Sequence, residues 1–337
     1  MSKVLVTGAG GYIGSITAGL LLQHGYEVVA VDNFSRGFEM PLETLKASFG
    51  DKLHIHKADL VENGGRDAFQ SHPEIEAVVH FAALLNVGES WKIPQRYFTN
   101  NVGGTARLLE QCVDHGVKKF IFSSTCAVYG NAQYIPIDEK HPIAEPVSPY
   151  GMTKLMSENL LTYYRRLNLV TSISLRYFNV CGATDDGATG DSKRPSFHLV
   201  QNAVRGALGI EPFALNYASV NTPDGSPIRD YVNVVDLADA HVRALAYLLK
   251  ENKSDVFNLG TGTGNSVLEI IQEVKKLTGK DFAVNEAPER RQGEADKMIA
   301  DIQKAKSVLG WEPKHTLAQS VDSLIKWYTS HPQGWEK

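Results

Sequence analysis

A tyrosine and a lysine one helical turn apart, Tyr150 and Lys154, are the residues of this chain with the clearest potential for proton chemistry. A phenol with its ordinary pKa near ~10 is a poor base at neutral pH. An ammonium group within hydrogen-bonding reach favours the phenolate, because an opposite charge stabilises the ionised form. The pair could therefore accept the proton of an alcohol, provided that a second group takes the hydride. Spacing alone is weak evidence, because both residue types are common here, so the surrounding elements must decide.

The helix that would carry this pair has clear start signals. Ser148 is a favoured N-cap residue and Pro149 suits the first helical position, which puts Tyr150 in the first turn. Upstream, Ser124 and Thr125 close an apolar strand-like run. Their hydroxyls could hydrogen-bond a substrate hydroxyl, or they could cap their own loop, and both interpretations stay open.

A glycine-rich turn near the start of the chain has the pattern of a dinucleotide site. A strand at residues 3–7 leads into a turn that runs from Gly8 to Gly14 and opens a helix, and the next strand, at 27–31, ends at Asp32. Glycine lets the backbone approach a pyrophosphate, and the helix N-terminus supplies amide donors. Asp32 can bind a ribose diol and would repel a 2′-phosphate, so the pattern favours NAD over NADP. The alternative is a plain βαβ turn.

Strands and helices continue to alternate through the first half of the chain. Further strands are expected at 54–58, 77–81, 119–122 and 171–176, with one helix opening at Asn100 and Asn101. This pattern predicts a Rossmann-like α/β fold, a doubly wound parallel sheet with both faces covered. In such sheets ligands bind beyond the carboxyl ends of the strands. The residues at these ends are Gly8, Asp32, Asp59, Ala82, Thr125 and Tyr177.

After about residue 180 the composition shifts toward glycine, aspartate, alanine and threonine, which predicts a loop around a polar ligand. We therefore expect an NAD-binding Rossmann domain at 1–180, with a returning segment near 230–262, and a smaller mixed α/β domain at 181–337. No long linker separates the two parts, so they should pack closely. Further helices are expected at 197–208, 234–249 and 267–277, and a strand at 255–259.

The overall composition is that of an ordinary globular protein. The chain has 337 residues, of which 43% are hydrophobic and 21% charged, and its net charge of -4 provides no basic field for nucleic acid or membrane. Cys112, Cys126 and Cys181 are scattered without metal-ligand spacing, so we expect free thiols and no metal site. The sequence shows no signal segment and no apolar run of about 18 residues. We therefore expect a cytoplasmic protein.

Basic residues are few in the second part of the chain. Arg229 follows a turn, and Arg291 follows another arginine after a proline. A guanidinium group matches phosphate oxygens bidentately, so both could bind a diphosphate. Each could equally be a salt-bridged surface arginine.

Short motifs in a fixed order extend over nearly the whole chain, and their ordered set is specific although each alone is modest. They are residues 6–15 (VTGAGGYIGS), 80–83 (HFAA), 87–90 (VGES), 122–125 (FSST), 148–154 (SPYGMTK), 175–179 (LRYFN), 229–232 (RDYV), 258–262 (NLGTG) and 331–335 (HPQGW). In this order they resemble the extended short-chain dehydrogenase/reductases and, within them, the UDP-glucose (UDP-galactose) 4-epimerases.

The resemblance implies NAD-dependent epimerisation at C4 of a UDP-hexose through a transient 4-keto sugar, with the NAD tightly bound. Tyr150 would take the proton of the sugar 4-hydroxyl while C4 passes its hydride to NAD. Lys154 would lower the pKa of Tyr150 and hold the nicotinamide ribose, and Thr125 would hydrogen-bond the reacting oxygen. These three are the predicted catalytic residues.

The resemblance also predicts the binding residues, with the UDP-sugar held largely by the second domain. The cofactor would contact Gly8, Gly11, Tyr12, Ile13, Gly14, Asp32, Asn33, Asp59, Leu60, Phe81, Ala82, Ala83, Asn100, Ser123, Tyr150, Lys154 and Tyr177. The UDP-sugar would contact Thr125, Tyr150, Asn179, His198, Leu199, Arg229, Arg291, Glu294 and Met298.

Several positions bear on how closely the chain follows the family pattern. Leu85 stands where some members have a lysine near the cofactor phosphates, and Glu294 replaces a common aspartate. The stretch 215–217 differs from the aromatic segment that usually touches uracil. Met298 falls where residue size is thought to govern acceptance of N-acetylated sugars, and an adaptable methionine decides nothing there.

Two alternatives to a UDP-glucose 4-epimerase remain. One is an epimerase of another UDP-sugar, such as UDP-GlcNAc, UDP-glucuronate or a UDP-pentose. The other, from a different class, is an inactive NAD-sensing regulator, although such regulators usually lack the Tyr150–Lys154 pair. A 4,6-dehydratase fits less well, because Cys126 and Ala127 stand where that relative needs an acid pair.

The resemblance finally suggests a homodimer. Leu108, Leu109 and Val113 form an apolar stripe on one predicted helix, and Tyr163 and Tyr164 are aromatic residues of the helix that carries Tyr150. These side chains permit a helical dimer seam.

Overall fold

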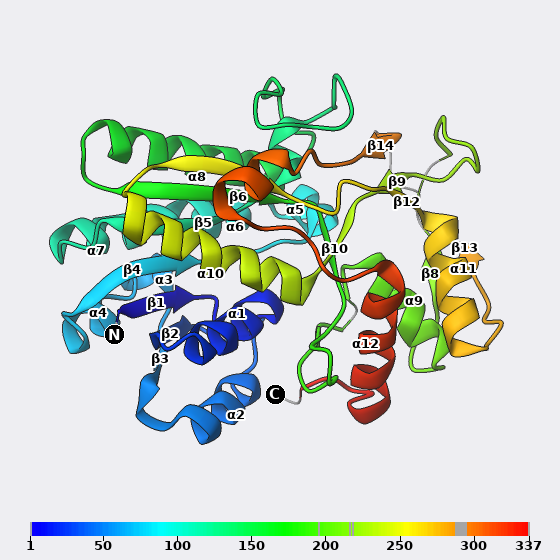
Figure 1. Ribbon diagram of the computed structural model, residues 1–337, viewed down its shortest axis with the longest axis horizontal. Helices are drawn as coiled ribbons and strands as arrows, with labels where there is room; N and C mark the ends of the chain where they lie inside the picture. Colours follow the sequence, from blue (N-terminus) through cyan, green and yellow to red (C-terminus); the bar gives the residue numbers. More distant parts are fainter. Residues whose placement is uncertain (1, 195, 216, 218, 287–294, 336–337) are drawn as a thin grey trace.

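A seven-stranded parallel sheet is the centre of the molecule (Figure 1). The computed structural model describes residues 2–194, 196–215, 217, 219–286 and 295–335. The strand order is β3-β2-β1-β4-β5-β6-β11, and all neighbours are parallel. The strands are β1 (Lys3–Thr7), β2 (Glu27–Asp32), β3 (Leu53–Lys57), β4 (Ile75–His80), β5 (Lys119–Thr125), β6 (Thr171–Tyr177) and β11 (Asp255–Leu259). The predicted doubly wound, Rossmann-like α/β fold is confirmed.

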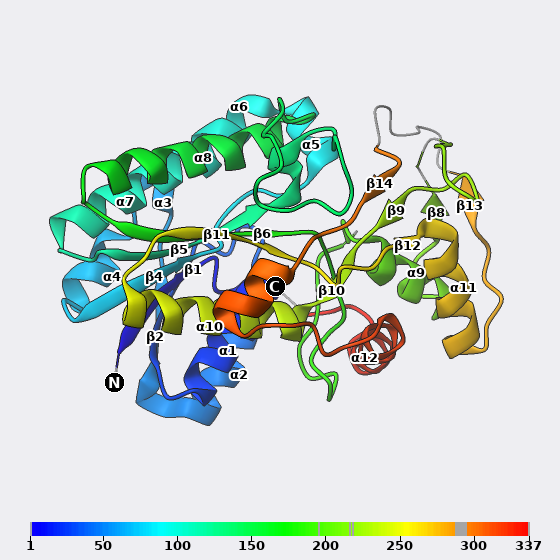
Figure 2. The ribbon, with the colours of Figure 1, turned by 45° about the horizontal axis from the view of Figure 1, so that its top comes forward.

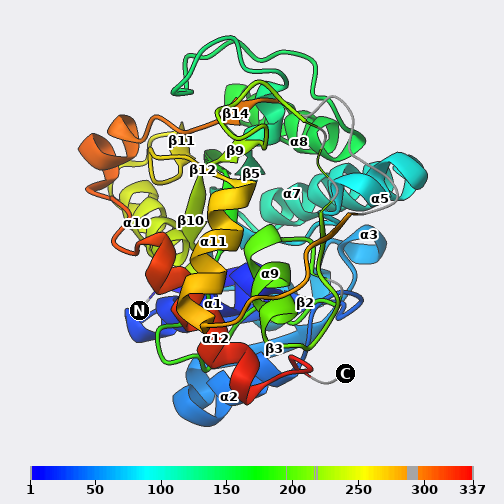
Figure 3. The same cartoon turned by 90° about the vertical axis from the view of Figure 1, so that its right-hand side faces the viewer.

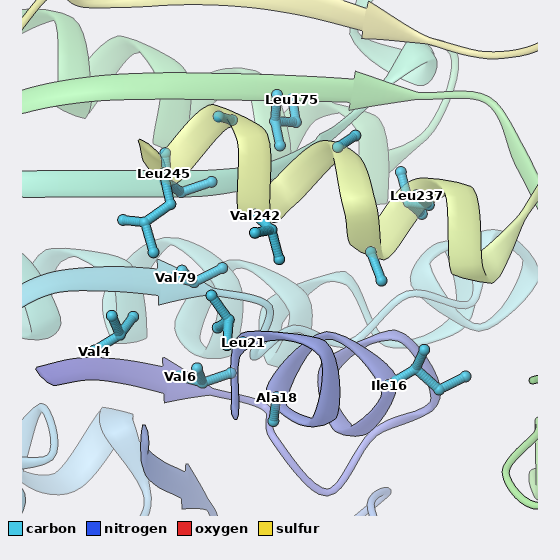
Figure 4. Close-up of a cluster of buried hydrophobic side chains, with 14 of the residues drawn as sticks. Val4, Val6, Ile16, Ala18, Leu21, Val79, Leu175, Leu237, Val242 and Leu245 are labelled. Carbon is cyan, nitrogen blue, oxygen red and sulfur yellow. The ribbon is translucent and has the colours of Figure 1, made fainter. Parts of the chain in front are cut away.

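Side-chain alternation along the strands divides the core between the two faces of the sheet. Val4 and Val6 of β1 point to one face, where they belong to a buried cluster with α1 (Tyr12–Gln23) and α10 (Val234–Glu251) (Figure 4). Leu5, between them, belongs to a second buried cluster on the opposite face. Figure 2 shows the resulting layers, with α7 (Gly104–Asp114) and α8 (Pro149–Arg166) on that opposite side.

The remaining helices of the first half are short and lie in the connections between strands. One of them, α2 (Met40–Phe49), follows β2 on the α1 side. The others are α3 (Leu60–Asn63), α4 (Arg66–Ser71), α5 (Val87–Lys92), α6 (Pro94–Tyr97) and the 3-10 turns at Gly50–Lys52 and Cys126–Tyr129.

A smaller lobe packs beside the carboxyl ends of the strands (Figure 3). Its helices are α9 (Leu199–Ala207), α11 (Val267–Thr278) and α12 (Leu317–Ser330), which share a third buried cluster. The short strands are β7 (Asn179–Cys181) with β10 (Tyr231–Asn233), β8 (Ala214–Leu215) with β13 (Asn285–Glu286), and β9 (Ile228–Arg229) between β12 (Asn265–Ser266) and β14 (Lys297–Met298). The expected helices at 197–208, 234–249 and 267–277 are therefore present, with ends shifted by one to two residues.

The helix expected to open at Asn100 begins earlier, so this prediction is wrong. Helical backbone starts with α6 at Pro94 and continues through a π-helical segment, Phe98–Gly103, into α7. Asn101 does not cap the helix, because its side chain bonds both the backbone N–H and the carbonyl of Leu84 (2.8 and 2.9 Å). The Asn101 side chain therefore bonds the distant backbone of Leu84 instead of capping its own helix, as the sequence suggested.

The predicted start of α8 is confirmed. Ser148 is the N-cap, its Oγ accepts a hydrogen bond from the Gly151 N–H at 3.1 Å, and Pro149 takes the first helical position. Tyr150 therefore lies in the first turn, next to the carboxyl end of the sheet.

Three further features concern the described residues alone. No helix there is long and apolar enough to cross a bilayer. No group of three or more histidine, cysteine, aspartate or glutamate side chains among them could hold a metal ion. The cysteines Cys112, Cys126 and Cys181 are free thiols.

Candidate active site

A cavity of about 1120 Å³ opens beyond the carboxyl ends of β1, β2, β4, β5 and β6. Every residue that the sequence assigned to the cofactor lines it. These residues are Gly8, Gly11, Tyr12, Ile13, Gly14, Asp32, Asn33, Asp59, Leu60, Phe81, Ala82, Ala83, Asn100, Ser123, Tyr150, Lys154 and Tyr177. The cavity is therefore long enough to join the glycine turn to the first turn of α8.

The glycine turn is shaped by close backbone approaches. Gly8 has φ +69°, and a Cβ there would lie 2.6 Å from the Ala82 nitrogen. A Cβ on Gly14 would lie 2.1 Å from the Gly8 carbonyl oxygen. Gly11 is the N-cap of α1 and offers no side-chain cap, so the first amide groups of α1 face the cavity. This N-terminus without a side-chain cap, in a glycine-rich turn, fits a diphosphate.

Asp32 at the end of β2 fits a ribose beside that diphosphate. One carboxylate oxygen accepts from the Gly10 N–H at 2.9 Å, and the other accepts from the Phe34 N–H at 2.8 Å. These bonds fix the carboxylate and leave acceptor capacity for a diol. Burial still raises the pKa of Asp32. On the next strand end, Asp59 caps α3 and accepts from Asn33 Nδ2 at 2.8 Å, so both lining side chains are mutually oriented.

The two neighbouring hydroxyls after β5 have different roles. Ser124 is buried and donates to Glu158, which also holds Arg176 through two bonds. Thr125 lines the cavity, caps the following turn at Ala127, and hydrogen-bonds the Tyr150 phenol. Of the two hydroxyls, only that of Thr125 lines the cavity, whereas that of Ser124 donates its hydrogen bond to the buried Glu158 carboxylate.

Lys154 projects from α8 into the same space. Its Nζ donates to the Ser123 carbonyl at 2.7 Å and lies 4.9 Å from the centre of the Phe122 ring. Burial lowers the pKa of Lys154 to about 7, although the nearby Glu158 carboxylate opposes this. Burial also raises the pKa of Tyr150, partly offset by the Thr125 hydrogen bond. The sequence predicted the opposite direction for Tyr150, because it gave no measure of how far the surrounding protein excludes water from the phenol.

His80 beside this pair is held neutral. Burial and the charge of Lys154 lower its pKa to about 3. Thr105 Oγ1 donates to the Asn101 carbonyl at 2.6 Å, so it can only accept from His80 Nε2 at 2.9 Å. His80 Nδ1 then accepts from the Thr7 hydroxyl at 2.6 Å. The chain of bonds fixes one tautomer and ties β1, β4 and α7 together.

The residues predicted to bind the sugar nucleotide fall into three groups by their position relative to the cavity. Thr125, Tyr150, Asn179, His198, Leu199 and Arg229 line the cavity. Arg291 and Glu294 lie outside the described residues. Met298 is buried in a separate apolar cluster with Val128, Ile137 and Phe178, and its strand pairs with that of Arg229. Its side chain thus packs behind the described wall of the cavity.

Sequence reasoning missed several lining residues. Ser35, Arg36 and Gly37 follow Asp32, and Lys193 comes from the segment that leads to α9. The positive φ of Phe34 turns the chain back over the cavity, a feature that only a Gly or Asn in its place would have signalled. Lys193 carried no local signal at all.

Comparison with known proteins agrees with this geometry. The model of the NAD dependent epimerase/dehydratase family matches residues 4–260. The UDP-glucose 4-epimerase of Lactobacillus helveticus is 42% identical, over 99% of each chain. That of Rhizobium meliloti (strain 1021) is 40% identical, also over 99% of each.

The same agreement extends to solved structures. The crystal structure of UDP-glucose 4-epimerase from Bifidobacterium longum, in complex with NAD+ and UDP, superposes with a TM-score of 0.93 at 35% identity. The match covers 99% of this chain and 100% of that one. The match in sequence, the match in fold and the cavity that suits a dinucleotide lead to one conclusion: the chain belongs to the NAD-dependent epimerase/dehydratase family.

Proposed function

We propose that this protein interconverts UDP-glucose and UDP-galactose by NAD-dependent epimerisation at C4, through a transient 4-keto sugar. One observation carries the proposal: the phenol of Tyr150 and the hydroxyl of Thr125 meet in the same cavity as the bare N-terminus of α1. A site that only senses NAD needs the second feature and has no use for the first. Full-length relatives that carry this activity support the same reaction.

In the proposed mechanism Tyr150 is the general base and acid. Its phenol accepts the proton of the sugar 4-hydroxyl and later returns it, while Thr125 hydrogen-bonds the same oxygen. Bound NAD supplies the acceptor and donor of the C4 hydride. Because burial raises the pKa of the phenol, the phenolate needs a cation nearby, and Lys154 is the charged side chain one turn away.

Lys154 has a second role in this proposal. Its bond to the Ser123 carbonyl uses one of three ammonium protons. The other two can bind the phenolate and a ribose hydroxyl of the cofactor. With its pKa near 7, Lys154 responds strongly to any anion placed beside it. A phenolate or diphosphate in the cavity therefore stabilises the charged form.

The two parts of the chain divide the substrate and cofactor between them. We assign the cofactor to residues 1–180 with the returning segment near 230–262, and the UDP-sugar to 181–337. His198, Leu199 and Arg229 would bind the UDP-sugar together with Asn179, which lies just before that boundary, because all four line the cavity. Arg229 would contact the diphosphate, since guanidinium matches phosphate oxygens.

The reaction is tested by following UDP-galactose with the purified protein by proton NMR. We expect conversion to UDP-glucose without added reductant, because the hydride is returned in each cycle. Parallel reactions with UDP-GlcNAc, UDP-glucuronate and a UDP-pentose measure the sugar preference. Absence of turnover with all of these substrates would contradict an epimerase and favour the NAD-sensing alternative.

We further propose that the protein is a homodimer joined along α8. Met156, Leu160, Tyr163 and Leu167 repeat at helical spacing on one stripe, and Tyr163 and Leu167 are 61% and 66% exposed. Leu108 and Leu109 of α7 are buried against the sheet and are not available to the seam. Light scattering after gel filtration gives the oligomeric state.

A reducing compartment, the cytoplasm, is the proposed location. Three free thiols in one chain are typical of proteins kept under reducing conditions. Fractionation of the source cells, followed by detection with an antibody, tests this location.

A further inference from the structure

Lys193 is a cation held over the cavity by a fixed backbone. Its N–H donates to Asp191 Oδ1 at 3.3 Å, and its carbonyl accepts from Arg205 Nη1 at 3.1 Å. The side chains of Asp191 and Arg205 are fully buried. Lys193 itself is only 12% exposed, and its Nζ lies 3.8 Å from Asp191 Oδ1. The side chain lines the cavity, so the charge is directed to a set place.

That place is next to the glycine turn. Tyr12 in the turn donates to the Gly182 carbonyl and packs against His198 with ring centres 6.0 Å apart. These contacts hold the segment that carries Lys193 against α1. Lys193 lines the same cavity as Asp32, Gly11 and Tyr12. Its charge opposes the rise that burial causes in the pKa of Asp32 and adds to the lowering that burial causes in the pKa of His198.

The other described cations that line the cavity are Arg36, Lys92, Lys154 and Arg229, of which Arg229 is assigned above to the diphosphate of the UDP-sugar. Arg36 pairs with Glu89 at 2.6 Å, and Lys154 is bonded to the Ser123 carbonyl. Lys92 is exposed on α5. At the glycine turn, neutral amide groups are the only donors from α1, and the wall at Leu84 and Leu85 is apolar. A dinucleotide diphosphate carries two negative charges, and burial without a cation is costly.

We propose that Lys193 binds the diphosphate of the NAD cofactor, so that the segment leading to α9 helps to retain the dinucleotide. The residue is thus a cofactor contact contributed by the smaller lobe. The ammonium exchanges its longer contact with Asp191 for charge-assisted bonds to phosphate oxygens. The inference rests on the NAD cofactor and is independent of which sugar is turned over.

The test measures cofactor retention directly. The protein and its Lys193→Met, Lys193→Arg and Lys92→Met variants are purified with bound NAD, and NAD per chain is determined after acid release. NAD loss is then timed during a chase with excess ADP-ribose. Met keeps the length of the side chain and removes the charge, so release should quicken by roughly tenfold to a hundredfold. The Lys193→Arg variant should release NAD at a rate near that of the parent, and the Lys92→Met variant should release it at the parent rate.

The diphosphate of the nucleotide sugar could bind the same lysine instead. Calorimetric titration of the NAD-loaded variants with UDP separates the two. We expect unchanged UDP affinity in Lys193→Met. NAD release at the parent rate would overturn the proposal, and so would a loss of UDP affinity without faster NAD release.

The experiment also separates this inference from the proposed reaction. If the chain binds NAD but epimerises no sugar, the function fails and the retention result still stands. Should Lys193→Met not fold, acetylation of the parent followed by mass spectrometry decides. Removal of NAD should then increase modification of Lys193 and leave Lys92 unchanged, and equal modification of Lys193 in both states would refute the contact.

Discussion

The side chain of Tyr150 is surrounded by protein in a way that opposes its proposed charge. Burial raises the pKa of the phenol and lowers that of Lys154 to about 7. Neither shift favours a phenolate–ammonium pair in the free protein. Both shifts favour a site in which the phenolate and the ammonium form only after ligands bind. In a buried cavity, the charge of a bound ligand has a large effect on the pKa of a neighbouring group.

Replacement of Tyr150 by phenylalanine tests the residue at the centre of the mechanism. Tyr150→Phe should lower turnover of UDP-galactose by on the order of 10² or more, because the general base is lost. NAD should remain bound, since the glycine turn and Asp32 are unchanged. Turnover and NAD content are measured on the same preparation.

Tyr134→Phe is the matched control for this variant. It removes a hydroxyl from an exposed tyrosine that does not line the described cavity, so turnover should equal that of the parent. A Tyr150→Phe enzyme as fast as the parent would remove Tyr150 from the mechanism.

Single residues also show what the sequence could and could not predict. The lining of the cavity by Asp32, Asp59 and Tyr177 followed from strand ends, which are local features. The different roles of Ser124 and Thr125 depended on Glu158, a partner on another element. The position of Lys193 depended on Asp191 and Arg205. Side-chain partners distant in the chain leave no local pattern.

At the scale of elements, α8 orients the reactive pair through its first turn. The Ser148 cap bonds the Gly151 N–H, directly after Tyr150. Thr316 caps the start of α12 as part of a capping box with Gln319, and it does not line the described cavity. The two caps therefore offer comparable helix chemistry with different relations to the site.

Removal of each cap separates stability from activity. Ser148→Ala and Thr316→Ala should each lower the free energy of unfolding by about 1 kcal/mol. Only Ser148→Ala should also lower kcat, because fraying of the first turn displaces the phenol. Urea unfolding and initial rates measure both effects. Equal kcat values for the two variants would argue that the cap does not position Tyr150.

Element boundaries were predictable where local chemistry sets them. The apolar runs gave all seven strands of the large sheet to within two or three residues, and Ser148 marked the start of α8. The helix through Asn100 was misplaced, because Pro94 starts it and the π-helical segment lets Asn101 reach Leu84. Such irregular turns are set by packing and commonly lie near functional sites.

At the scale of the whole molecule, two buried histidines make stability depend on pH. Burial lowers the pKa of His80 to about 3 and that of His241 to about 4. His241 Nδ1 is paired with the Leu237 carbonyl, and its Nε2 has no partner among the described residues. Both rings are neutral in the folded protein at pH 6, whereas they begin to protonate in the unfolded chain below about 6.5.

The free energy of unfolding should therefore fall as the pH drops from about 6.5 to 4. The unfolded chain binds protons that the folded protein excludes, and each histidine contributes a slope of up to about 1.4 kcal/mol per pH unit. The stabilising contribution of the two histidines is fully present above their pKa in the unfolded chain. It is lost as the pH falls toward their pKa in the folded protein. Urea unfolding of the parent and of His241→Leu across this range should give a shallower slope for the variant.

His24→Gln serves as the reference for that comparison, because His24 is exposed. Its slope should match the parent. If His241→Leu had the parent slope as well, the buried ring would not be a source of the acid sensitivity.

The pairing of β11 with β6 has a consequence for synthesis of the protein. The sheet takes its last strand from residues 255–259, after the chain has left it at residue 177. While the ribosome adds the intervening residues, β6 is an open edge, and α10 is not yet present to cover Leu175. An unpaired apolar strand invites pairing with other nascent chains. The first 180 residues therefore bear most of the loops that line the cavity but cannot finish their own sheet. Chaperone protection matters most until residue 259 emerges.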